Sequence, residues 1–403
     1  MAASDAPGLH RRRRADGPIR FHTSFHNTVY DVMCRRGWKE VDMDGAWDVA
    51  WADRELVNEI FDTQHMDSHQ KVNHYRNCRE LCRKDNLMKN VKKMKRQLER
   101  DGRTDEAAEF DFCPITFTLP GDYALFKEEF KRLGSRSPVS DWRSDKRWKP
   151  ENPTVEPYVV QRYISNPYLI GGKKFDMRMY VLVPSFSPLT VWLYRAGFAR
   201  FSARRYSSAM ADVDDVEVHC TNVAIQKHGE HYNAETGGKW DLRSLKMHLI
   251  SKHGVAAVDT LFQGMEGIVV RSLMSVQRCM ITDKHCYELY GYDFLFDADL
   301  RPWLIEVNAS PSLTANTRED YDRKFKLLHD TFDVVDMEGK LAGDETSIGG
   351  FDLIWKDGPV VAHPGSKYTS MLGADFSQSL APAISRAAPT PVTAAAGAGG
   401  SAP

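Results

Sequence analysis

The sequence predicts a mixed α/β (α+β) protein with a small N-terminal α/β unit, and three observations support this. First, 403 residues with 42% hydrophobic and 27% charged side chains are typical of a folded chain with a sizeable core. Second, residues 173–183 alternate apolar and polar side chains, and residues 290–308 contain two more strand-like runs. Third, apolar side chains recur at helical spacing in residues 25–33 and 83–102. Both strands and helices therefore contribute to the expected fold.

The chain divides into five parts in order. Residues 1–17 carry a run of four arginines without apolar periodicity, which predicts a flexible basic tail. Residues 18–66 combine helical and strand-like patterns and predict the small α/β domain. Residues 67–154 are mostly helical and polar, whereas residues 155–360 hold most of the strand signals. Residues 361–403 shift to Ala, Gly, Ser, Pro and Thr, which predicts a disordered tail.

Charge and cysteine content disfavour several classes of protein. The chain has 54 Lys and Arg against 55 Asp and Glu, a net charge of −1, which disfavours a globally basic nucleic-acid binder. No apolar run approaches the roughly 18–20 residues of a membrane helix. Seven cysteines without a Cys-x-x-Cys pair suit a reducing compartment. We therefore expect neither nucleic acid nor a membrane among the partners.

A β-hairpin is predicted where two aromatic and β-branched runs flank the turn-forming residues 297–302. If the turn centres between residues 299 and 300, Asp293 faces Glu306, and Asn308 lies on the same face as Glu306. Opposed carboxylates repel unless a cation lies between them, and an oxygen-only ligand set favours Mg²⁺ or Mn²⁺. The alternative is a solvated hairpin face without a metal.

Residues 173–183 form the second informative strand. Lys174, Asp176 and Arg178 share one face, and apolar side chains share the other. Cationic side chains in such a row suit phosphate oxygens, which Arg can bind with two hydrogen bonds. A salt-bridged surface strand is the alternative.

The helix predicted over residues 83–102 is strongly basic. Residues 79–103 contain ten Lys and Arg against four acidic residues, roughly +6 in a near-neutral protein. Such a surface attracts acidic partners in a salt-dependent way. The alternative is an ordinary solvated helix face.

An ordered set of motifs resembles the tubulin–tyrosine-ligase-like family over about residues 19–360. The motifs, in chain order, are Gln161–Ile164, Gly172–Arg178, Tyr194–Arg195, His219-x-Thr221-Asn222, Tyr290–Asp293 and Leu304–Ser312. The resemblance implies an ATP-grasp fold and ATP-dependent ligation of an amino acid onto tubulin tails. It favours the tubulin polyglutamylases, which join L-glutamate to glutamate side chains through an isopeptide bond by way of an acyl phosphate. Glycine or tyrosine as the added amino acid stays open.

The resemblance also implies roles for individual residues. Asp293, Glu306 and Asn308 would hold Mg²⁺, in agreement with the hairpin argument. Arg178 and Arg195 would be catalytic, and Arg195 would bind the incoming glutamate together with Lys227 and Lys324. The implied ATP-binding residues are Gln161, Arg162, Tyr163, Ile164, Lys174, Asp176, Thr221 and Asn222. The basic helix would contact the acidic tails of α/β-tubulin in microtubules through Lys89, Lys92, Lys93, Lys95 and Arg96.

One segment departs from the family pattern. A Trp-Ile-x-Lys-Pro strand and a Gly-rich phosphate lid are expected between Phe130 and Val155, and about thirty residues are missing there. No Gly-x-x-x-x-Gly-Lys-Ser/Thr loop replaces them. A microtubule-binding isoform with impaired catalysis is therefore the alternative to an active ligase. By resemblance, we expect the chain in the cytoplasm on the cytoskeleton, at a cilium or flagellum axoneme or basal body, with a targeting partner there.

Overall fold

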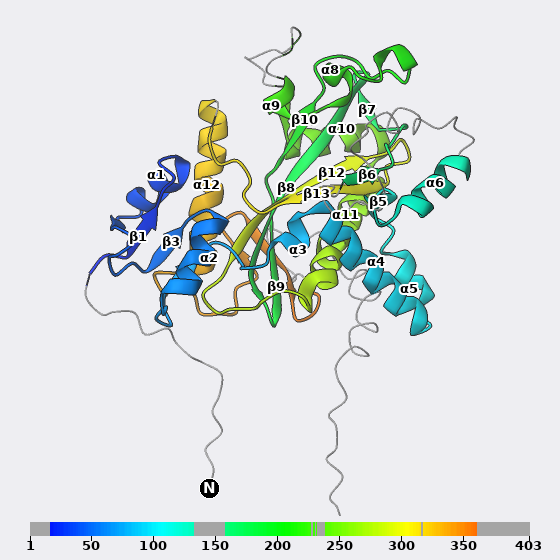
Figure 1. The fold of residues 1–403 in the computed structure, drawn as a ribbon. Helices are drawn as coiled ribbons and strands as arrows, with labels where there is room; N and C mark the ends of the chain where they lie inside the picture. Colours follow the sequence, from blue (N-terminus) through cyan, green and yellow to red (C-terminus); the bar gives the residue numbers. More distant parts are fainter. Residues whose placement is uncertain are drawn as a thin grey trace, which may run out of the picture.

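The computed structural model describes residues 17–132, 158–226, 229, 231, 238–315 and 317–360. The expected tails (apart from Gly17), the departing segment from residue 133 to Val155, and Lys227 lie outside these residues. The fold is mixed α/β, as the sequence predicts (Figure 1). Within the described ranges, no helix is both long and apolar enough to cross a membrane.

The N-terminal part is a four-stranded parallel sheet in the order β2-β1-β3-β4. Its elements are β1 (Arg20–Thr23), α1 (Thr28–Arg35), β2 (Lys39–Glu40), β3 (Val49–Trp51), α2 (Arg54–Thr63) and β4 (Lys71–Val72). Side-chain caps start both helices: Asn27 accepts from Val29 N in α1, and Asp53 accepts from Leu56 N in α2. The predicted helix and strand of this unit are both confirmed.

The middle of the chain is mostly helical. It contains α3 (Arg79–Cys82), α4 (Lys84–Arg100), α5 (Thr104–Ala108), α6 (Tyr123–Arg132) and a two-stranded antiparallel sheet of β5 (Thr116–Leu119) and β6 (Tyr158–Gln161). The predicted basic helix is α4, which buries Leu87, Val91 and Leu98 and packs on α11 (Val255–Gln277). The helical spacing of apolar side chains in this segment therefore predicted the buried face correctly.

A nine-stranded sheet forms the centre of the molecule (Figure 1). Its strands are β7 (Leu169–Ile170), β8 (Lys173–Phe186), β9 (Leu189–Tyr194), β10 (Phe198–Phe201), β11 (Lys239–Asp241), β12 (Glu288–Phe296), β13 (Pro302–Asn308), β14 (Ser347–Ile348) and β15 (Phe351–Lys356). The long strand β8 is its axis, because it pairs antiparallel with β7, β9, β10 and β12. The remaining elements are η1 (Met210–Asp212), α8 (Val216–His219), α9 (Val223–Gln226), α10 (Leu242–His253) and α12 (Arg318–Val335).

The two faces of β8 meet different surroundings. Phe175, Met177, Met179, Val181 and Val183 point into a hydrophobic cluster that also contains much of α11. On the opposite face, Tyr180 and Leu182 join a second cluster with the N-terminal sheet and α12. The first half of that face carries Lys174, Asp176 and Arg178 instead. One end of this face is therefore available for charge chemistry, while the other end anchors the sheet.

The predicted hairpin is β12–β13, and the pairing of Asp293 with Glu306 is confirmed. The register nearer the turn was predicted wrongly by one residue, since Phe294 pairs with Leu304 and not with Ile305. A β-bulge at Ile305 absorbs the difference. Asp297 closes the turn by accepting from Asp299 N, Arg301 N and Trp303 Nε1 at 3.0–3.1 Å.

Candidate active site

Charged side chains form a row across four adjacent strands, β10, β8, β12 and β13. Arg200 lies opposite Asp176, Arg178 opposite Asp293, and Asp293 opposite Glu306. Because directly paired residues project to the same face of a sheet, these side chains meet. We call Arg200, Asp176, Arg178, Asp293 and Glu306 the charged row.

Two arginines hold the carboxylate of Asp293. Arg178 donates to both of its oxygens, with Nη2 to Oδ2 at 2.9 Å, and Arg200 Nη2 lies 2.9 Å from Oδ2. Burial would raise the pKa of Asp293, but the hydrogen bonds and charges of Arg178 and Arg200 outweigh it and hold that pKa below its usual range. Asp293 is therefore a buried, ionised carboxylate.

Arg200 joins the two acids of the row. It also donates from Nε to Asp176 Oδ1 at 2.8 Å and from Nη2 to Oδ2. Burial raises the pKa of Asp176, and the nearby Asp293 carboxylate adds to this; Arg200 and a hydrogen bond from Thr221 oppose it. Asp176 therefore depends on Arg200 for its negative charge.

Glu306 and Asn308 lie at the open end of the row. The Glu306 side chain is 39% exposed, and Asn308 Nδ2 lies 3.2 Å from Glu306 Oε1 and 3.4 Å from Asp293 Oδ2. Lys84, the first residue of α4, reaches Glu306 Oε2 at 3.6 Å. The three side chains expected to bind metal are therefore brought together.

Lys174 marks the other end of the site. Its Nζ donates to His219 O at 2.9 Å and Tyr163 Oη at 3.1 Å, and lies 4.5 Å from the centre of the Tyr163 ring. Burial lowers the pKa of Lys174. Tyr163 also shares a 2.8 Å hydrogen bond with His219 Nδ1. This aromatic and cationic corner is joined to the charged row through the Thr221–Asp176 hydrogen bond.

The other expected ATP-binding residues lie on nearby segments. Gln161 ends β6 and donates from Nε2 to Thr116 Oγ1 at 3.0 Å, and Arg162 N donates to Ile115 O at 2.8 Å. Ile164 is half-buried in the connection that follows. Asn222 O accepts from the N–H groups of residues 225 and 226 and so begins α9.

Sequence reasoning missed three cations of this site, Arg200, Lys84 and Lys239. Lys239 Nζ lies 3.8 Å from Asp320 Oδ2, and burial lowers the pKa of Lys239. Alternation in Phe198–Phe201 places Arg200 on the same face as Phe198, and only the pairing with β8 shows that Arg200 meets Asp176. No local signal singled out Lys84 or Lys239.

A model of the tubulin-tyrosine ligase family matches residues 62–342, well over half of the chain. The chain belongs to the tubulin–tyrosine ligase family. It is 45% identical to "Probable tubulin polyglutamylase TTLL9" of Rattus norvegicus over 405 aligned positions, covering 88% of this chain and 87% of that protein.

More distant relatives in this family carry similar names. The chain is 43% identical to "Probable tubulin polyglutamylase ttll-9" of Caenorhabditis elegans, covering 84% of this chain and 85% of the relative. It is 36% identical to "Probable alpha-tubulin polyglutamylase Ttll1" of Tetrahymena thermophila, covering 85% and 94%.

In this tubulin–tyrosine ligase family member, the two described residues expected at the glutamate pocket are both engaged with acids. Arg195 donates to Asp352 from Nε at 2.8 Å and Nη2 at 2.9 Å, and from Nη1 to Gly349 O at 2.9 Å. Lys324 is buried and donates from Nζ to Asp320 at 2.9 Å and to Thr314 O at 2.6 Å. A substrate carboxylate at either cation must therefore compete with an acid of the protein.

Some cations of the basic helix α4 bond to other parts of the protein, and others are exposed to solvent. Lys92 donates to Thr116 O at 2.8 Å, and Lys95 pairs with Asp111 at 2.6 Å. Lys89, Lys93 and Arg96 are exposed, and at spacings of four and three they share one face. No ion pair is found for these three within the described part of the chain. They form the outward-facing positive surface of α4.

The residues at the open end of the row suit a divalent cation. Their oxygens come from two carboxylates and one amide, the ligand types that Mg²⁺ prefers. Asn308 Nδ2 now faces the carboxylates of Asp293 and Glu306. If the amide rotates by half a turn, its oxygen takes the place of Nδ2 and can bind a cation. All three side chains can then turn an oxygen toward one point.

Proposed function

We propose that this chain is an ATP-dependent tubulin polyglutamylase that joins L-glutamate to glutamate side chains of tubulin C-terminal tails. The observation that carries the proposal is the identity of 45% across most of the chain with a protein named as a probable tubulin polyglutamylase. The site geometry supports it, because acids and fixed arginines meet on one face of the central sheet.

The proposed reaction makes an isopeptide bond in two steps. An acceptor carboxylate oxygen first attacks the γ-phosphorus of ATP, whose bond to ADP breaks, giving an acyl phosphate. The amine of free glutamate then attacks the acyl carbon, phosphate leaves, and the amine loses a proton. Mg²⁺, or Mn²⁺, when held by Asp293, Glu306 and Asn308, would neutralise charge on the phosphate oxygens.

The protein's own residues bind and orient the reactants in this scheme. Arg178 is a fixed cation beside the metal ligands, where it stabilises negative charge developing on the transferred phosphoryl group. Lys174 faces the nucleotide phosphates, and Asp176 and Thr221 face the ribose. Arg162, Ile164 and Asn222 complete the nucleotide pocket with Gln161 and Tyr163. The proposal therefore includes an ATP-grasp arrangement, with ATP between β5–β6 and the central sheet.

Donor glutamate is placed at Arg195, with Lys324 and Lys227 as further candidates. The Arg195 guanidinium already makes two hydrogen bonds to Asp352. To bind the donor glutamate, Arg195 must give up at least one of these hydrogen bonds and form one to a glutamate carboxylate instead. Glutamate supplies two carboxylates, which suits a pocket with more than one cation.

The outward-facing surface of α4 is proposed to hold the acidic tubulin tail. Three of the expected tail-binding cations are exposed, namely Lys89, Lys93 and Arg96. The other two, Lys92 and Lys95, already bond to residues of the same protein. Reversing the charge at Lys89 and Lys93 should weaken microtubule binding about tenfold at low salt, and much less at high salt, because salt screens exposed charges. Microtubule cosedimentation measures this, and the Lys92→Gln variant, which alters an internal hydrogen bond, should bind within about twofold of wild type.

One observation favours the second candidate, a microtubule-binding isoform with impaired catalysis. The alignment with the rat relative has 405 positions but covers 88% of this chain, which is about 355 residues. About fifty aligned positions of the relative therefore have no counterpart here. A missing lysine strand and Gly-rich lid, expected between Phe130 and Val155, would account for part of them. Within the family, glycine or tyrosine as the donor is the remaining alternative.

ATP-dependent incorporation of labelled glutamate into microtubules tests the proposed function. Wild type should incorporate label, and Glu306→Gln should lose at least a hundredfold in rate, because one metal-binding carboxylate becomes neutral. Labelled glycine and tyrosine, in parallel, test the donor. Binding to microtubules without incorporation of any donor would overturn the ligase proposal and establish the second candidate. We place the enzyme in the cytoplasm on the cytoskeleton, at an axoneme or basal body through a targeting partner.

A further inference from the structure

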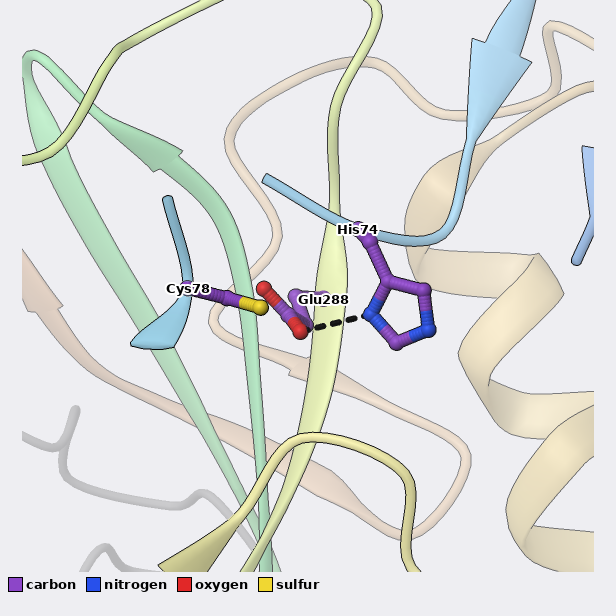
Figure 2. Close-up of side chains that lie close together, drawn as sticks. All are labelled: His74, Cys78 and Glu288. Atoms are coloured by element: carbon purple, nitrogen blue, oxygen red, sulfur yellow. Dashed lines mark hydrogen bonds and ion pairs between the residues drawn. The ribbon is translucent and has the colours of Figure 1, made fainter. Parts of the chain in front are cut away.

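A carboxylate and an imidazole form a fully buried pair outside the charged row. Glu288 begins β12, and His74 follows β4 in the connection to α3. His74 Nδ1 lies 2.6 Å from Glu288 Oε1, and the two side chains are 3% and 0% exposed (Figure 2). Tyr75 N donates to Glu288 Oε2 at 3.2 Å and Tyr290 Oη at 2.8 Å. Both carboxylate oxygens are therefore occupied.

This arrangement fixes which ring nitrogen of His74 faces outward. With Nδ1–H donated to Glu288, Nε2 lies on the opposite side of the ring and is the nitrogen left to meet another group (Figure 2). Ser310 Oγ lies 3.4 Å from that nitrogen. A carboxylate, an imidazole and a hydroxyl are thus connected in line, although Ser310 is 236 residues from His74 in the chain.

The segment that carries His74 is held firmly on both sides. Asn73 exchanges two hydrogen bonds with the backbone of Ala52, at 2.9 and 3.0 Å. Tyr75 Oη donates to Val183 O at 3.2 Å, and Val72 N donates to His285 O at 2.9 Å. His74 is therefore fixed between the N-terminal sheet and the central sheet.

Ser310 connects this support to the candidate active site. It is exposed and follows the expected metal ligand Asn308 by two residues. The same loop is held further along, where Thr28 Oγ1 donates to Leu313 O at 2.9 Å. Pro311 lies close to Gly291, the residue that pairs with Asn308.

We propose that the Glu288–His74 pair is a positioning device that holds Ser310, and through it keeps Asn308 in place to bind Mg²⁺. The inference rests on the proposed function in one respect, the assignment of Asn308 as a metal ligand. Cys78 offers a sulfur within 4.8 Å of the ligand atoms of His74 and Glu288, so a buried metal site is the competing explanation. The positioning role is favoured because Glu288 already accepts three hydrogen bonds.

Four variants of the full chain test the proposal. Ser310→Ala removes the hydroxyl, and Ser310→Thr restores it at an exposed position. His74→Asn keeps an amide N–H where Nδ1 faces Glu288 but has no atom that reaches Ser310. Cys78→Ala is the matched control, since Cys78 belongs to the buried group yet does not connect to the loop.

Two measurements are made on each variant. The first is hydrogen–deuterium exchange of residues 306–314 without nucleotide or metal. The second is the Mg²⁺ concentration for half-maximal binding of a fluorescent ATP analogue. Ser310→Ala and His74→Asn should exchange faster in the loop and need about three- to tenfold more Mg²⁺, the effect expected of one hydrogen bond. Ser310→Thr and Cys78→Ala should match wild type, and the analogue's affinity without Mg²⁺ should stay within twofold.

Each contrary result has one meaning. Unchanged loop exchange and Mg²⁺ dependence in His74→Asn would reduce the pair to a core hydrogen bond and overturn the proposal. Zinc bound to wild type by elemental analysis, and lost from both His74→Asn and Cys78→Ala, would overturn it in favour of a metal site. Because both measurements avoid glutamate ligation, a wild type that binds Mg·ATP but ligates nothing refutes the proposed function alone.

Discussion

Replacing Arg200 by glutamine should be among the most damaging single changes in the site. Its guanidinium is 12% exposed and bonds both Asp176 and Asp293. Asp293 keeps Arg178 after the substitution, whereas Asp176 keeps only the hydroxyl of Thr221. The change therefore leaves one acid of the row without a counter-ion.

The cost can be bounded from this geometry. Removing one partner of a buried ion pair costs roughly 3–5 kcal/mol. Asp176 is 14% exposed and can take up a proton, which limits the loss, so we expect about 3 kcal/mol of unfolding free energy for Arg200→Gln. Arg200→Lys keeps the charge but loses the two-pronged geometry, and should cost about 1–2 kcal/mol.

The loss should also depend on pH. Burial already raises the pKa of Asp176 in the folded protein, and removing Arg200 raises it further. An acid with a raised folded-state pKa destabilises the fold as pH rises through that pKa. The difference between wild type and Arg200→Gln should therefore shrink when the pH is lowered toward the ordinary range of an aspartate.

Urea unfolding at pH 7.5 and pH 5, together with the KM for ATP, measures these effects. The KM should rise at least tenfold, because Asp176 and its neighbours face the proposed nucleotide. Arg204→Gln is the matched control, because it breaks an exposed ion pair with Asp215 that solvent screens, and it should cost far less stability. If Arg200→Gln lost no more stability than Arg204→Gln, or kept the wild-type KM, the charged row would not be an interdependent unit.

Two further predictions concern packing and pH. Gly291→Ala places a methyl group 3.1 Å from Arg178 Cδ and Nη1 and from Pro311 Cβ. Urea unfolding should therefore show a loss of about 1–3 kcal/mol in unfolding free energy, and ATP affinity should fall by a larger proportion because Arg178 shifts. Unchanged stability and affinity would mean that the backbone of the strand moves to accommodate the methyl group. Arg36 bonds Glu338 at 2.9 and 2.7 Å; burial alone would raise the pKa of Glu338, but Arg36 holds it below its usual range. This pair therefore stabilises the fold above the ordinary pKa of a glutamate, and less as pH falls through the lowered value. The stability difference between wild type and Arg36→Gln should be about 3 kcal/mol at pH 7 and should shrink steadily as the pH is lowered below the ordinary range of a glutamate. A difference independent of pH would contradict the assignment.

Local patterns were enough to predict part of this site. The Asp293–Glu306 pairing depends only on a short turn, so register could be counted from the sequence. The bulge at Ile305 could not, because its neighbours Leu304 and Val307 continue the same apolar strand pattern. The count was correct at Asp293 because two one-residue differences offset each other: the pairs nearest the turn are centred on Asp299, and the bulge adds one residue to β13.

Long-range contacts explain what the sequence left out. Arg200 gains its role from pairing between β8 and β10, and Lys84 reaches Glu306 across more than 200 residues of chain. Helix α11 gave no amphipathic signal either, because its buried residues lie on every side of the helix. Such a pattern identifies buried chain but not the type of element.

The packing of the N-terminal sheet against α12 has a consequence for how this protein is made. Trp38 and Trp51 stack edge-on against Phe332, with ring centres 5.0 and 5.8 Å apart. A ribosome adding about 5–20 residues per second needs roughly 15–60 s between the tryptophans and their partner. During that interval α12 has not yet been made, so the part of the N-terminal apolar surface that packs on α12 stays uncovered. A nascent-chain chaperone is therefore expected to bind this region, and truncated messages that omit α12 should yield insoluble product.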